Sequence, residues 1–239
     1  MKKYLLAALL LSLSLSSFAG GDKYIAAMKG TLAMLDTATT VQTVQNCANR
    51  FERIGNAEKK EWLPFYYASL NHITMSYMVT ENDQKDAHLD KAEEYLKKAR
   101  EMKVKDKEKA ELVLLQGMIY GSRIQVEPQT RSMKYGPLSG QQYSRAVNLD
   151  PENPRATYMQ GQSLMFTPEM FGGGRDKAIP VMEEAVEKFK AWEAPSEIHP
   201  DWGEEDCVKM LEFAKSGEKA PWEEDAEGEG EMEEKSEEE

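Results

Sequence analysis

The stretch that decides the fold lies between residues 143 and 185. It reads Tyr143-Ser-Arg-Ala-Val-Asn-Leu-Asp-Pro151, then Tyr158-Met-Gln-Gly-Gln-Ser-Leu164, then Asp176-Lys-Ala-Ile-Pro-Val-Met-Glu-Glu-Ala185. Small residues recur where two packed helices would touch, and prolines stand between the segments. Along the rest of the chain apolar residues recur at steps of three and four, without long alternating runs. The sequence therefore predicts an all-α protein.

A repeated pattern of small residues extends this prediction. Gly117 and Gly161 each follow a glutamine and are 44 residues apart, and a residue without a side chain there lets a second helix approach closely. Ala92, Leu96 and Ala99, and again Ala178, Met182 and Ala185, form sets of a small, a bulky and a small residue at steps of four and three. The residues expected at these helix contacts are Ala92, Leu96, Ala99, Gly117, Tyr143, Ala146, Gly161, Ala178, Met182 and Ala185.

This pattern resembles the tetratricopeptide-repeat family, whose members stack antiparallel helix pairs into an α-solenoid. The resemblance implies about three to four divergent, TPR-like repeats here. Because the spacing of 44 residues exceeds the family norm of about 34, we expect enlarged turns at residues 80–85, 127–138 and 167–174.

The N-terminal sequence predicts that the protein is exported from the cytoplasm. Lys2 and Lys3 precede an apolar run over residues 5–15, and Ser17-Phe-Ala19 has the form of a cleavage site, so residues 1–19 are expected to be a signal peptide cut after Ala19. The helical-repeat domain is expected over residues 20–216. We expect a periplasmic or secreted protein without a membrane span.

The charge is concentrated in a C-terminal tail over residues 217–239, which we expect to be disordered and solubilising. The whole chain has a net charge of −12, and residues 218–239 hold twelve acidic residues and two lysines. No basic stripe is present to neutralise phosphates, so nucleic-acid binding is disfavoured.

No motif for catalysis, metal or cofactor binding stands out, so we expect a non-catalytic protein without a cofactor. His72 lies in an aromatic segment and is interpreted as a core or groove residue rather than a metal ligand. Cys47 and Cys207 could form one disulfide, but two buried thiols are favoured because the ends of a stack lie far apart.

The segment over residues 167–175 holds three glycines followed by Arg175. The favoured interpretation is a structural turn in which Phe171 fills the core. The alternative is an anion site formed by backbone N–H groups and Arg175.

First helices line the inner face in the resembled family, so a binding groove is predicted on that face. Its expected residues are Tyr66, Leu70, Met118, Ser122, Arg155, Tyr158 and Gln162. Tyrosine and methionine there suit an extended, partly apolar ligand or another protein surface. The alternative interpretation for Tyr66 and Tyr67 is that these aromatic side chains fill the gap between neighbouring helices. The main hypothesis is an exported scaffold that binds a protein or peptide partner on its concave face. The alternative is a small-solute-binding helical-repeat protein associated with envelope transport, with its ligand near Tyr158 and Arg175.

Overall fold

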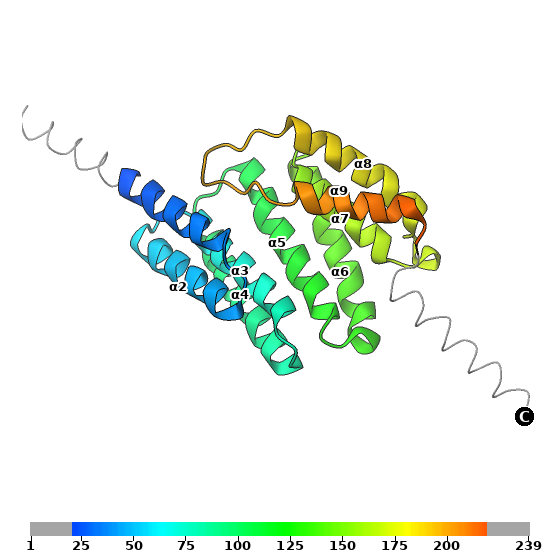
Figure 1. Ribbon diagram of the computed structural model, residues 1–239, viewed down its shortest axis with the longest axis horizontal. Coiled ribbons are helices and arrows are strands. Elements are labelled where there is room, and N and C mark those ends of the chain that lie inside the picture. Colours follow the sequence, from blue (N-terminus) through cyan, green and yellow to red (C-terminus); the bar gives the residue numbers. More distant parts are fainter. Residues whose placement is uncertain (1–20, 219–239) are drawn as a thin grey trace, which may run out of the picture.

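The computed structural model describes residues 21–218, and within this range the secondary structure is entirely helical (Figure 1). A helix over residues 21–35 comes first. It is followed by α2 (Val41–Ala57), α3 (Leu63–Met78), α4 (Asn82–Glu101), α5 (Asp106–Ile124), α6 (Pro128–Leu149), α7 (Pro154–Phe166), a 3₁₀ turn (Glu169–Phe171), α8 (Arg175–Ala191) and α9 (Glu204–Ser216). The predicted signal peptide and nearly all of the predicted acidic tail lie outside the described residues.

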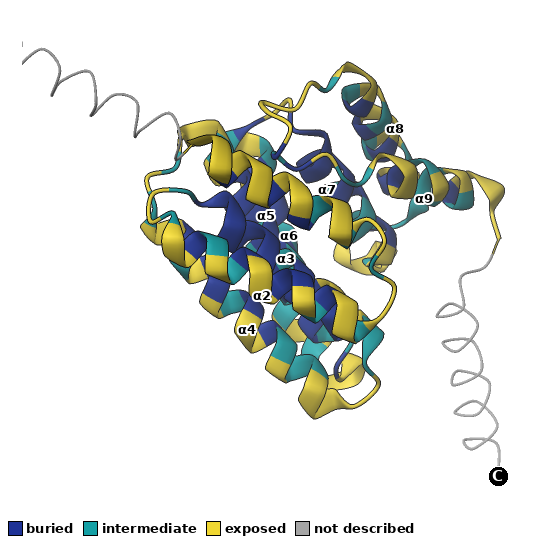
Figure 2. Ribbon diagram, turned by 60° about the vertical axis from the view of Figure 1, so that its left-hand side comes forward, coloured by how far each residue is buried: buried dark blue, intermediate teal, exposed yellow. Residues whose placement is uncertain are grey.

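Neighbouring helices pack in pairs along the chain. The most extensive contacts join α3 to α4, α5 to α6 and α7 to α8, and α5 also contacts α3 and α7. Figure 2 shows buried residues on α5 and α7 and exposed residues on the outer faces of α2 and α4. None of the helices in the described part of the chain has the length and apolar character to cross a membrane.

The glycines of the repeated pattern lie at the tightest helix contacts. A Cβ atom added to Gly117 would lie 2.5 Å from the Tyr143 ring, and one added to Gly161 would lie 2.7 Å from Cγ of Met182. Real Cβ atoms do not approach other heavy atoms so closely, so α6 and α8 pack against α5 and α7 at distances that only glycine permits. The other eight expected contact residues are each at most 3% exposed: Ala92, Leu96, Ala99, Tyr143, Ala146, Ala178, Met182 and Ala185.

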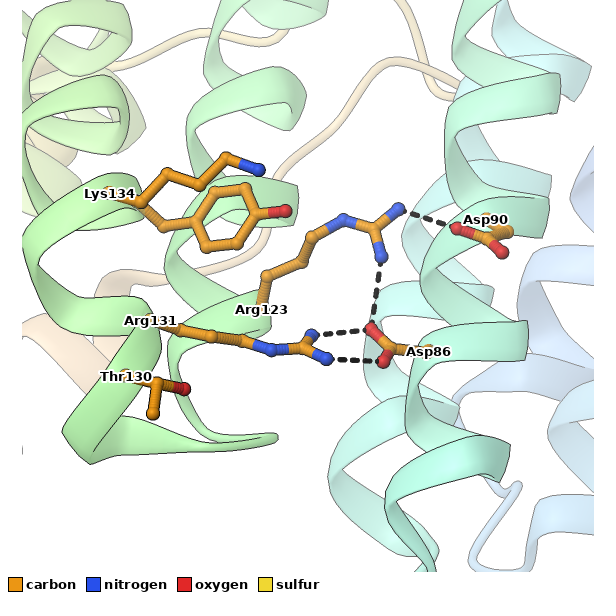
Figure 3. Close-up of a pocket in the computed structure, with 7 residues that line it drawn as sticks. Asp86, Asp90, Arg123, Thr130, Arg131 and Lys134 are labelled. Carbon is orange, nitrogen blue, oxygen red and sulfur yellow. Dashed lines mark hydrogen bonds and ion pairs between the residues drawn. The ribbon is translucent and has the colours of Figure 1, made fainter.

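Two of the three expected enlarged turns are corrected. The α3–α4 connection spans only residues 79–81, because residues 82–85 already belong to α4. Residues 128–138 are helical and form the first half of α6. Pro128 occupies the first turn of α6, where a missing N–H costs little. Pro137 lies inside the helix, where it removes one backbone hydrogen bond. Arg131 fixes this part of α6 to α4 through a two-point ion pair with Asp86, both distances being 2.7 Å (Figure 3). Tertiary contacts thus outweigh the local signals of Gly136 and Pro137.

The glycines after α7 form a turn, as the favoured interpretation expected. Gly172 and Gly174 have φ angles of 90° and 104°, in the left-handed region that residues with side chains avoid. Phe171 corrects one detail, because it is 60% exposed and does not fill the core. The Arg175 guanidinium donates to the backbone carbonyl of Phe213, near the end of α9.

Residues 192–203, named here the crossing segment, run from the end of α8 past the N-terminal end of α5 and return to α9 (Figure 1). Trp202 Nε1 donates to Tyr66 Oη at 2.9 Å. Tyr67 Oη donates to the backbone carbonyl of Ile198 at 3.0 Å. Glu197 forms an ion pair with Lys29 in the first helix. The crossing segment therefore covers part of the face on which the groove was expected.

Both cysteines are free and buried, which agrees with the favoured interpretation of two thiols. Burial raises the pKa of the Cys207 thiol to about 12. The thiolate needed for oxidation or metal binding is therefore scarce at neutral pH.

Candidate functional site

A pocket of about 660 Å³ lies at the end of the helical assembly where α3 and α5 begin. Four segments line it: the start of the first helix, the α2–α3 connection, the α4–α5 connection and the crossing segment. Its volume lies within the range of roughly 300–1,000 Å³ that is typical of small-molecule sites. We name it the strap pocket, after the crossing segment that forms one wall.

The wall of the strap pocket is partly apolar and aromatic. Its apolar lining residues are Tyr24, Ile25, Trp62, Leu63 and Ile198. Ile25 is 36% exposed, whereas the other four are mainly buried. Trp62 packs edge-on against the His199 ring, with the ring centroids 6.2 Å apart. The pocket therefore offers aromatic surface beside one exposed aliphatic side chain.

Positive groups surround the same opening. The lining includes Lys60, Lys103 and Lys105, and no ion pair of Lys60 or Lys103 is found within residues 21–218. The N-terminal ends of α3 and α5 also lie here, and helix N-termini favour negative charge. Acidic side chains are present too, because Asp22, Glu61 and Glu108 also line the pocket. The two lysines without ion pairs are the groups best suited to meet a carboxylate ligand.

His199 connects the crossing segment to α5. Its Nε2 lies 3.3 Å from Glu108 Oε1, and its Nδ1 lies 2.7 Å from Ser196 Oγ. Glu108 also accepts a hydrogen bond from the backbone N–H of Lys105 at 3.1 Å, which caps the start of α5. Both ring nitrogens of His199 therefore already have polar partners, and the imidazole positions this wall.

The phenol of Tyr24 is the unusual polar group of the strap pocket. Tyr24 is 8% exposed, and its oxygen is buried without a hydrogen-bond partner among the described residues. Burial raises the pKa of this phenol, and the charges of Glu61 and Glu58 raise it further. The group therefore remains protonated and can donate a hydrogen bond, and a buried donor without an acceptor is destabilising.

A second pocket, of about 390 Å³, lies between α4, α5 and α6 (Figure 3). Arg123 donates to Asp86 at 3.0 Å and to Asp90 at 2.7 Å, while Arg131 also binds Asp86. The hydrogen bond from Arg131 is the main cause that lowers the pKa of Asp86. The guanidinium groups of Arg123 and Arg131 already bind carboxylates on α4. These ion pairs hold α4, α5 and α6 together and leave little positive charge for a ligand.

The expected groove residues separate into two groups. The first group is at most 4% exposed and consists of Tyr66, Ser122, Arg155 and Tyr158. The second group is partly exposed and consists of Leu70, Met118 and Gln162. Only the second group remains accessible to a partner, so the expected open groove is corrected at the four buried positions.

Two of the buried positions, Tyr66 and Arg155, belong to a polar network. Arg155 donates to Glu111 through Nε at 3.1 Å and through Nη2 at 2.6 Å. Its guanidinium also lies 4.7 Å from the Trp192 ring centroid. Tyr66 donates to the same carboxylate at 3.1 Å. Arg155 and Tyr66 therefore connect α3, α5 and α7 rather than facing a ligand.

The residues of the strap pocket were not expected from the sequence. They come from four connections and helix ends that are far apart along the chain, and no spacing rule joins them. The available signal was Trp62 near Lys60 at the start of α3, and Lys103 and Lys105 just before α5. Only the three-dimensional arrangement of the helices shows that the starts of α3 and α5 lie side by side.

A solved structure provides the relevant comparison. The chain is similar to the HusA haemophore from Porphyromonas gingivalis, with 31% sequence identity and a TM-score of 0.73. The match covers 83% of this chain and 96% of the haemophore chain. No protein-family model and no curated protein matches the sequence. The likeness extends over nearly the whole haemophore at more than 30% identity, and the chain therefore belongs to the same family as this haemophore.

Proposed function

We propose that this chain is an exported binding protein for haem, held in the strap pocket of a TPR-like helical stack. The observation that carries the proposal is the 31% identity to a haemophore over 96% of that protein's length. The predicted signal peptide supports export. Haem is the cargo here and not a catalytic group.

The composition of the strap pocket supports this choice of ligand. Haem is a flat, largely apolar ring that carries two carboxylates. The ring would lie against Ile25 and the edges of Trp62 and Tyr24, while Lys60 and Lys103 meet the carboxylates. A small rotation of the Tyr24 ring would let its unpaired phenol donate to one of them. Both ends of the ligand thus find complementary groups in one pocket of suitable volume.

A titration of the mature protein with haem, followed by visible absorbance, tests the proposal. The informative variant is Ile25→Glu, which places a charge on the apolar wall. Met34→Glu is the matched control, because Met34 lies on the same helix and is 37% exposed, against 36% for Ile25. We expect Ile25→Glu to weaken binding by about ten-fold or more, since a buried charge costs several kcal/mol, and Met34→Glu to leave it unchanged.

The carboxylate contacts need a separate pair of variants. Lys103→Glu should weaken haem binding, whereas Lys134→Glu, at the second pocket, should not. A mature protein that does not bind haem at all would overturn the proposed function. Binding that is equally insensitive to Ile25→Glu and Lys103→Glu would move the haem site away from the strap pocket.

A protein or peptide partner on the concave face is the second candidate function. The observation in its favour is that Leu70, Met118 and Gln162 remain partly exposed. Gln162→Ala together with Met118→Ala should then abolish capture of that partner and leave haem binding intact.

A further inference from the structure

Two histidines meet at the contact between α3 and α4, away from the strap pocket. His72 on α3 and His88 on α4 place their Nδ1 atoms 3.2 Å apart. The two rings are tilted by 46°, with centroids 5.3 Å apart. His72 is 4% exposed and packs against the Tyr95 ring, while His88 is partly exposed. From this geometry we propose that the pair is a binding site for a divalent transition-metal ion such as Cu²⁺ or Zn²⁺.

The distance between the nitrogens suits one shared ion. With metal–nitrogen bonds of about 2.0–2.1 Å, two nitrogens 3.2 Å apart subtend an angle of about 99–106° at the metal, close to tetrahedral. Small side-chain rotations of the two imidazoles would turn their lone pairs from each other toward the ion. The helix contact has therefore already brought the two ligands to chelating distance.

The protonation states also favour metal binding. Burial, followed by the neighbouring His88, lowers the pKa of His72 to about 4, and burial lowers the pKa of His88. The two Nδ1 atoms lie within hydrogen-bond distance of each other, so in the metal-free protein one of them carries the shared proton, and a bound ion would require that proton to move to Nε2. Because both pKa values are lowered, metal binding need not displace a charge-bearing proton, which is the usual competitor at a histidine site.

The surroundings set the remaining ligands. Within residues 21–218 no group of three or more His, Cys, Asp or Glu side chains is arranged to hold a metal ion. Water on the partly exposed side of His88 would complete the coordination. Glu52 and Glu94 attract positive charge at His72, and Lys91 opposes them. Imidazole ligands suit Zn²⁺ and Cu²⁺, and Cu²⁺ is the tighter of the two at most nitrogen sites.

Calorimetric titration of the mature protein with Cu²⁺ and with Zn²⁺ tests this site, and it does not depend on the proposed haem binding. The informative variant is His88→Ala, because alanine suits the partly exposed position on α4. The matched control is His199→Ala, and both variants retain the acidic tail. We expect His88→Ala to weaken metal binding by about ten-fold or more and His199→Ala to preserve it. Equal binding by His88→Ala and the unmodified protein would overturn the proposal.

Nuclear magnetic resonance spectroscopy of the unmodified protein tests the metal site independently of any variant. Zn²⁺ should shift the nitrogen resonances of His72 and His88 together, and leave those of His199 in place. If His88→Ala fails to fold, this measurement still tests the site. Unchanged His72 and His88 resonances at saturating Zn²⁺ would refute it.

Discussion

Replacement of Glu111 by alanine is the sharpest test of how the helical stack is held together. Glu111 is 5% exposed and lies on α5. Its carboxylate accepts from Arg155 twice, at 3.1 and 2.6 Å, from Asn153 at 2.6 Å and from Tyr66 at 3.1 Å. One side chain therefore connects α3, α5 and α7, and Tyr66 extends the connection to the crossing segment through Trp202.

The expected loss of stability follows from the positive charge of Arg155, which Glu111→Ala leaves without its partner. Arg155 is 1% exposed, so without Glu111 its positive charge is buried and unpaired. Removing one partner of such a pair costs about 3–5 kcal/mol, a large fraction of a typical total stability of about 5–15 kcal/mol. For a chain of this size that loss corresponds to a decrease in Tm of about 6–20 °C.

Urea and thermal unfolding followed by circular dichroism measure this effect. The control is Glu94→Ala, which removes an exposed ion pair with Lys91 and should change the free energy of unfolding by less than about 1 kcal/mol. The double variant Glu111→Leu with Arg155→Met removes both charges, so it should be more stable than Glu111→Ala alone. If Glu111→Ala matches the Glu94→Ala control, the buried ion pair does not stabilise the stack.

Three further outcomes follow from the packing. Gly161→Ala should destabilise the protein by about 1–3 kcal/mol in urea unfolding, because the added methyl group would lie 2.7 Å from a neighbouring side chain. Gly30→Ala, at an exposed helical position with open space around it, should stabilise by up to about 1 kcal/mol. Burial and His88 lower the pKa of His72 from 6.5 to about 4, so the unfolded chain takes up this proton first. The corresponding stability is complete above pH 6.5 and is lost as the pH falls toward 4, by at most about 3 kcal/mol. His72→Gln should flatten that part of the pH dependence, and an unchanged slope would count against it. Cys207 should resist a thiol reagent in the folded protein and react on unfolding; rapid labelling under native conditions would show that it is not buried.

Much of the fold could be predicted because close helix packing requires small residues at particular positions in the sequence. Gly117 and Gly161 mark two close helix contacts in the sequence itself, since a side chain at either position would collide with the facing helix. Apolar residues at steps of three and four predicted an all-α protein, and the described residues are entirely helical in their regular secondary structure. Glycine therefore identified contacts between segments that are neighbours along the chain.

Two parts could not be predicted, and both depend on distant contacts. The start of α6 was interpreted as a turn because Pro128, Gly136 and Pro137 disfavour a helix locally, yet Arg131 binds Asp86 on another helix. The groove was expected to be open because nothing in the pattern indicates that residues 192–203 return across it. The preference for a protein partner depended on that open groove. The haem-binding function proposed above is nearer to the small-solute alternative stated at first.

The crossing segment changes how this stack should respond to unfolding. In an open array each repeat touches only its neighbours, so the two ends can unfold independently. Here Glu197 contacts Lys29, and Ile198 binds Tyr67, 131 positions earlier. These contacts join the C-terminal part of the protein directly to the first helix and to α3. Fraying at the C-terminal end should therefore loosen the first helix as well, and we expect the described residues to unfold as one cooperative unit.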